Sequence, residues 1–161
     1  MKKFLGILIV LVSLSPLHAA IQFRTGLSAS LLTGFSFVPE VDFGNFAVGG
    51  SIGYVFFESE NSSSGPSFGF FMGYTDLPED GKGIYNDIGL ELIHTPIDLI
   101  QTSLNLYFKC GYSFSNMLRA GMVCRLPIIP NIGNDYDFWA SLGQGFLTLL
   151  MGVGVEITLS F

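Results

Sequence analysis

Residues 152–161 of this 161-residue chain read GVGVEITLSF, with an apolar side chain at every second position. From Val153 to Phe161 the apolar positions alternate with glycine, glutamate, threonine and serine. Successive side chains of a β-strand point to opposite faces of the sheet. The period of two therefore predicts a strand with one apolar face and one polar face.

The same period of two recurs along the chain. The other predicted strands are residues 21–31, 45–57, 67–75, 84–93, 102–114, 118–126 and, with a weaker pattern, 137–143; the last strand is expected from about Leu147 to Phe161. The stretches between them, such as VPEVDFG (38–44) and HTPID (94–98), are rich in turn-forming residues. The sequence thus predicts about eight strands joined by short connections.

The charged residues indicate the environment of each strand face. Seven charged residues of the predicted strands fall on the face opposite the apolar one: Arg24, Asp87, Glu91, Lys109, Arg119, Arg125 and Glu156. In a soluble sandwich this face would point to water, and in a membrane barrel it would point to the lumen. The polar face is mostly glycine, serine and threonine, which suits a crowded lumen better than a water-facing surface.

These patterns predict an all-β fold, a closed antiparallel transmembrane up-and-down β-barrel. A sheet edge cannot face hydrocarbon, because its unpaired backbone groups would each cost several kcal/mol. The first strand is therefore expected to pair with the last. Phe23, Phe56, Phe68, Phe138 and Phe161 are predicted near one rim, and Phe46, Tyr74, Tyr112 and Phe114 near the other.

Residues 1–20 have the layout of a secretory signal peptide. Two lysines precede an apolar run from Phe4 to Leu14, and Ala19 and Ala20 offer a cleavage site. The barrel domain is then 21–161. Loss of Lys2 and Lys3 moves the net charge from −6 to about −8, which disfavours nucleic acid as a partner.

The final stretch resembles the C-terminal strand of bacterial outer-membrane β-barrel proteins. The residues that carry the resemblance are Val153, Val155, Ile157, Leu159 and Phe161. In that family the barrel-assembly machinery recognises this pattern as an insertion signal. By size the chain is similar to OmpX-type and OmpW-type barrels or to the membrane domain of OmpA-type proteins. The resemblance implies an outer-membrane location, periplasmic termini, and outer-membrane lipid and the assembly machinery as partners.

The inward residues are the candidate site. The seven charges are expected to form an ion-pair network that plugs the lumen, with Arg24 and Glu156 paired where the first and last strands meet. The alternative is a lumen lined for a passing solute. Five aromatic residues also fall on the inward face: Phe57, Phe71, Tyr85, Tyr107 and Trp139. They either fill the lumen or line a pocket for small hydrophobic compounds, as OmpW-type barrels are thought to do.

The sequence offers little for catalysis. Outer-membrane lipid deacylases and palmitoyltransferases use a histidine with a serine and an acidic residue near the outer leaflet. Only His94 is left after the predicted signal peptide, and its turn is expected on the periplasmic side. We expect no enzyme activity, no cofactor and no metal site. Cys110 and Cys124 are expected as diagonal neighbours on the outward face, about 7–8 Å apart, which is long for a disulfide. Two free thiols are the favoured outcome, and a disulfide in the oxidising compartment is the alternative.

Three functions follow as hypotheses. The first is a non-enzymatic outer-membrane barrel with a plugged lumen and a structural or surface-interaction role. The second is a channel or binding barrel for small, mainly hydrophobic molecules. The third, and least favoured, is an outer-leaflet lipid-modifying enzyme.

Overall fold

A computed structural model of the chain describes residues 21–56, 64–78, 80–97, 100–129, 132 and 138–161. The predicted signal peptide and Phe57 lie outside the described residues. The strands are β1 Ile21–Ser30, β2 Gly34–Phe43, β3 Phe46–Val55, β4 Gly65–Asp76, β5 Gly83–His94, β6 Thr102–Ser113, β7 Leu118–Ile129 and β8 Gly154–Ser160. Helix α2 spans Phe138–Met151 between β7 and β8.

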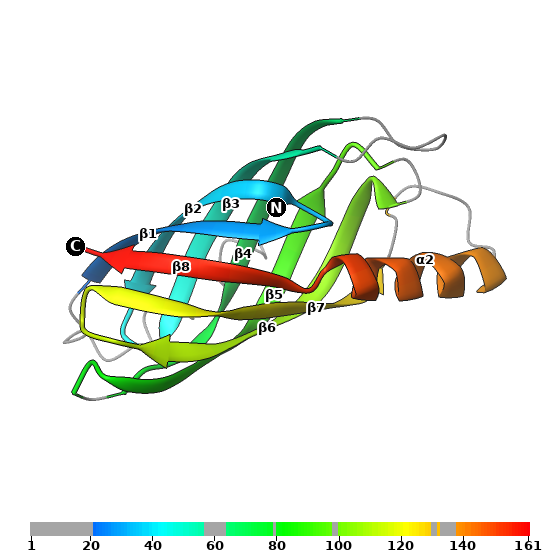
Figure 1. The fold of residues 1–161 in the computed structure, drawn as a ribbon. Helices are drawn as coiled ribbons and strands as arrows, with labels where there is room; N and C mark the ends of the chain where they lie inside the picture. The colour runs from blue at the N-terminus through cyan, green and yellow to red at the C-terminus, as the bar shows by residue number, and fades with distance from the viewer. Residues whose placement is uncertain (1–20, 57–63, 79, 98–99, 130–131, 133–137) are drawn as a thin grey trace, which may run out of the picture.

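The eight strands form one closed barrel in sequence order, and β8 pairs with β1 to complete it. All neighbouring pairs are antiparallel (Figure 1). The predicted fold class, a closed antiparallel up-and-down barrel, is confirmed. We call the end that holds Ile21 and Phe161 the proximal end, and the end that holds the turn 31–33 and α2 the distal end.

Two assignments are wrong: one strand was missed, and part of a helix was predicted as a strand. The total of eight strands is therefore unchanged. Residues 38–44 were predicted as a turn, but most of them belong to β2, which the sequence analysis missed. Residues 137–143 were predicted as a strand, but from Phe138 the chain is helical. The helix also takes the start of the predicted last strand, so β8 begins at Gly154 and not at Leu147.

The additional strand reverses the predicted direction of β3 to β7. The turn after His94 therefore lies at the distal end, opposite Ile21, and not on the side of the termini as predicted. For the same reason, several aromatic residues lie at the opposite rim from the predicted one. Phe56 and Phe68 lie towards the distal end, while Phe46, Tyr74, Tyr112 and Phe114 lie towards the proximal end with Phe23 and Phe161.

The barrel has its apolar side chains outside and its polar ones inside. Each strand exposes large apolar side chains outward, for example Leu27 at 69%, Phe35 at 72% and Ile84 at 71%. The buried side chains are largely serines, threonines and charged residues. Among the strand residues that the structure describes, Asp76 alone carries a charge on the outward face, at the proximal end of β4.

Helix α2 follows β7 and leads directly into β8 at the distal end (Figure 1). It carries no charged residue. Thr148 and Met151 are buried, whereas Leu142, Phe146 and Leu150, spaced four residues apart on one helix face, are exposed. In the part of the chain that the structure describes, no helix is both long enough and apolar enough to cross a membrane.

Candidate functional site: the barrel lumen

The lumen receives all seven charged side chains named from the sequence. Arg24, Asp87, Glu91, Lys109, Arg119, Arg125 and Glu156 are each at most 7% exposed. Glu40 and Asp42 join them from β2, at 4% and 2% exposed. The sequence analysis missed these two carboxylates because it assigned them to a turn. A charge buried in a protein interior costs free energy unless it is paired and hydrogen-bonded.

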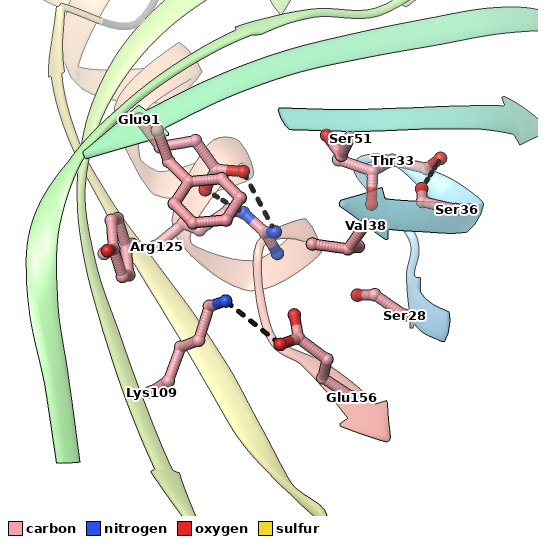
Figure 2. Close-up of a pocket in the computed structure, with 11 residues that line it drawn as sticks. Ser28, Thr33, Ser36, Val38, Ser51, Glu91, Lys109, Arg125 and Glu156 are labelled. Carbon is pink, nitrogen blue, oxygen red and sulfur yellow. Dashed lines mark hydrogen bonds and ion pairs between the residues drawn. The ribbon is translucent and has the colours of Figure 1, made fainter. Parts of the chain in front are cut away.

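Lys109 lies at the centre of the network and reaches across the lumen from β6. Its Nζ lies 3.0 Å from Oε1 of Glu156 on β8 (Figure 2). It also lies 3.5 Å from Oε2 of Glu40 on β2. The same ammonium group lies 4.5 Å from the centre of the Phe71 ring, within the range of a cation–π contact. One side chain thus connects three other strands of the barrel.

Arg125 forms the second centre. Its Nε donates to Oε2 of Glu91 at 2.7 Å and its Nη2 donates to Oε1 at 3.3 Å, so the pair is bidentate (Figure 2). Its Nη1 donates to the carbonyl of Gly152, just after α2, at 3.2 Å. A cation at the C-terminal end of a helix also complements the helix dipole. Arg125 therefore holds α2 to the barrel wall.

The predicted pair of Arg24 with Glu156 is wrong. Across the β1–β8 seam, Arg24 stands opposite Ser160, and Glu156 stands opposite Ser28. Arg24 instead pairs with two β2 carboxylates: its Nη1 lies 2.9 Å from Glu40, and its Nη2 contacts Asp42. The prediction used only the fact that β1 and β8 are adjacent. Which of their residues lie opposite each other depends on the stagger between strands in the closed barrel.

Asp87 and Arg119 complete the proximal part of the lumen. Thr75 donates a hydrogen bond from its hydroxyl to Asp87. The guanidinium group of Arg119 lies 5.9 Å from the centre of the Tyr85 ring. Among the described residues no carboxylate forms an ion pair with Arg119. Its contribution to the network is therefore a contact with an aromatic face.

Three of the predicted lumen aromatics are buried and lie over glycines of neighbouring strands. Tyr85 covers Gly111 and Gly121, Tyr107 covers Gly73 and Gly89, and Phe71 covers Gly49. The Phe71 and Tyr107 rings meet edge to face, with centroids 5.6 Å apart. Trp139 lies on α2, so its predicted place on an inward strand face is wrong.

The glycines leave the space that these rings occupy, so a larger residue should destabilise the barrel. A Cβ added at Gly49 would lie 2.3 Å from Cζ of Phe71 and 2.7 Å from the carbonyl oxygen of Pro39. We expect Gly49→Val to lower the free energy of unfolding by about 1–3 kcal/mol through overpacking. Urea titration in detergent micelles, followed by gel mobility, measures the change.

The neighbouring Gly50 provides a matched control for this prediction. Its added Cβ would meet only the carbonyl oxygen of Gly69, at 3.2 Å, on the outward face. Gly50→Val should change the free energy of unfolding by no more than about 0.5 kcal/mol. Equal losses for the two variants would show that the filled lumen is not the cause.

The cavity between Lys109, Glu156, Arg125 and Glu91 is small. The cavity that Figure 2 shows has a volume of about 10 Å³, enough for roughly one water molecule. Its walls include Lys109, Glu156, Arg125 and Glu91, together with serines of β1 to β3. The lumen at this level is filled by side chains.

An apolar cluster, which the sequence analysis did not predict, packs at the distal end. We call it the distal apolar cluster; its buried members are Leu32, Val55, Ile93, Ile97, Ile100 and Met151, with Leu147 packed against them. The residues come from strand ends, connections and α2. Leu32, Ile97 and Ile100 lie outside the predicted strands, and the other members were assigned to three different strands, so strand periodicity gave no signal for the cluster.

The structure gives the surroundings of His94 and of the two cysteines. His94 is exposed, and its Nδ1 lies 2.9 Å from the hydroxyl of Thr102. The described residues contain no cluster of three His, Cys, Asp or Glu side chains that could hold a metal ion. Cys110 pairs with Met122 and Phe108 with Cys124, so the two cysteines are diagonal neighbours, as the register predicted, and they are not bonded to each other.

The C-terminal residues lie on the outward face. Val155, Ile157 and Leu159 point outward from β8 and are about half exposed. Val153 precedes the strand, and Phe161 follows it, with its N–H donating to the carbonyl of Phe23 at 2.9 Å. Comparisons with models of protein families, with curated proteins and with solved structures give no match to this chain.

Proposed function

We propose that this protein is a non-enzymatic β-barrel of the bacterial outer membrane with a plugged lumen, which serves envelope structure or surface interaction. The observation that carries the proposal is the inverted distribution of side chains. An ion-pair network is sealed inside a closed barrel, while large apolar side chains are exposed on the outward face of each strand. In water this outward surface would cost free energy, and in hydrocarbon it would not.

Strand length supports a membrane-spanning barrel. Strands β1 to β7 have between 10 and 12 residues, and a tilted transmembrane strand needs roughly 9 to 11. Strand β8 has 7 residues because α2 takes the chain up to Met151. With the proximal end in the periplasm, the distal end and α2 face the cell exterior. Outer-membrane lipid and the barrel-assembly machinery are the partners that this proposal implies.

The proposal predicts insertion into a bilayer and heat-modifiable migration. Protein extracted in mild detergent should run faster on a gel when unheated than when boiled, and far-UV circular dichroism should show sheet. In a flotation gradient the refolded protein should rise with lipid vesicles. A chain that stays monomeric and folded in buffer without detergent would refute the membrane location.

The filled lumen predicts the absence of a conducting path. Because the space at the level of Lys109 and Glu156 holds only about one water molecule, purified protein in a planar bilayer should give no stepwise conductance. A known porin in the same bilayer is the positive control. Defined single-channel openings would favour the channel hypothesis over the plugged barrel.

A further inference from the structure

A groove on the outer surface of the barrel lies at the distal end, across the seam between β8 and β1. Its volume of about 550 Å³ falls within the range of small-molecule sites. Ala29 lies between the two walls, since it pairs with Phe35 of β2 on one side and with Val155 of β8 on the other. Leu31 and Phe56 also line the groove. A small side chain between larger ones creates the hollow.

The chemistry of the groove suits an alkyl chain. None of its described lining residues is charged, and Ser30 contributes the single polar side chain among them. That hydroxyl already bonds to Thr33, since it accepts from the Thr33 N–H at 3.1 Å and lies 2.9 Å from the Thr33 hydroxyl. Among the described lining residues, no polar side chain is left to recognise a polar ligand group.

The walls of the groove are supported by packing. The rings of Phe35 and Phe56 meet edge to face, with centroids 6.3 Å apart, and Tyr54 packs on Phe56 at 4.9 Å. Val55 lines the groove and is also a buried member of the distal apolar cluster. The groove is therefore backed by the apolar interior and not by the ion-pair network.

We infer that this groove binds one acyl chain of a membrane lipid. The inference rests on the proposed function, because the groove opens sideways on the exposed apolar face and is continuous with it through Leu27, Phe37 and Ile157. In a bilayer this face is covered by lipid chains, so a chain reaches the groove without crossing water. A chain held in a hollow makes contacts on several sides, unlike one on the flat barrel wall.

Photolabelling in vesicles tests the inference. The probe is a phosphatidylethanolamine with a diazirine in one acyl chain, and mass spectrometry locates the labelled peptides. Labelling should concentrate on residues 29–35 and 153–155 compared with other outward segments. Ala29→Phe fills the hollow and should reduce labelling at 153–155 roughly tenfold, the effect of about 1.4 kcal/mol of lost contact.

Ala120→Phe is the matched control. Ala120 also faces outward between two larger residues, Tyr112 and Ile157, but it does not line the groove. This variant should leave labelling at 153–155 unchanged. Uniform labelling around the barrel that Ala29→Phe does not alter would show ordinary lipid contact and overturn the inference. Labelling by a photoreactive free fatty acid but not by the phospholipid would also overturn it.

Flotation of the same samples with vesicles separates the two proposals. Protein that floats but labels uniformly refutes the groove and leaves the membrane barrel intact. Protein that does not float refutes the membrane barrel itself.

Discussion

Lys109→Met is expected to lower the free energy of unfolding by about 3–5 kcal/mol, the usual cost of removing one partner from a buried ion pair. The ammonium group lies within 3.5 Å of carboxylate oxygens of both Glu40 and Glu156, and all three side chains are at most 6% exposed. Methionine matches the length of the lysine side chain but leaves Glu156 without a cation. Urea unfolding of the refolded protein in detergent micelles measures the loss.

Neutralising the carboxylates that Lys109→Met leaves unpaired should restore most of the lost free energy of unfolding. In the triple variant Lys109→Met, Glu40→Gln and Glu156→Gln, the centre of the lumen holds polar but uncharged groups. Arg24 keeps Asp42 as its partner. Recovery is expected because the main cost of the single variant is an uncompensated buried charge. A single variant that loses less than about 1 kcal/mol, the range of exposed pairs, would show that water enters the lumen and screens these charges.

Arg125→Met is expected to have an effect of similar size, about 3–5 kcal/mol, through a different part of the barrel. The variant removes the bidentate partner of Glu91 and the donor to the Gly152 carbonyl. Since the second bond holds the end of α2, the helix should also loosen. Hydrogen exchange of the α2 amides should therefore increase in Arg125→Met, in addition to the shift in urea midpoint.

Two variants separate the contributions at Arg125. Arg125→Met with Glu91→Met removes both charges and should leave a deficit of about 1–3 kcal/mol, from the unpaired Gly152 carbonyl. Arg119→Met is the matched control, because Arg119 is also buried but forms no ion pair with a described carboxylate. A loss for Arg119→Met as large as for Arg125→Met would contradict the assigned role of the Glu91 pair.

The missed strand β2 shows where local patterns mislead. FSFVPEVDF (35–43) does alternate, with Phe35, Phe37 and Phe43 exposed outward and Glu40 buried. Pro39 and two carboxylates gave it the composition of a turn, since proline cannot donate to a strand ladder. The β2–β3 register has no partner for Val38 or Pro39. The alternation of this stretch was the signal that would have found the strand.

Helix α2 was missed for a related reason. Phe138, Ala140 and Leu142 fit a period of two over a short stretch. Over a longer window, Leu142, Phe146 and Leu150 recur every four residues, which is the helical period. A window of seven residues is too short to separate the two periods.

In the strands that it predicted correctly, the sequence by itself determined the face on which each residue lies. The seven named charges, and the aromatics Phe71, Tyr85 and Tyr107, are buried in the lumen. This was possible because the alternation of side chains is a local property of an extended backbone.

Only the tertiary structure decided which inward groups meet. Lys109 reaches Glu156 and Glu40, and Arg24 reaches β2 instead of Glu156. These partners depend on the number of strands, their stagger and the closure of the sheet, which bring together residues far apart in sequence. Periodicity along one strand does not show which residues of another strand lie at the same height along the barrel axis.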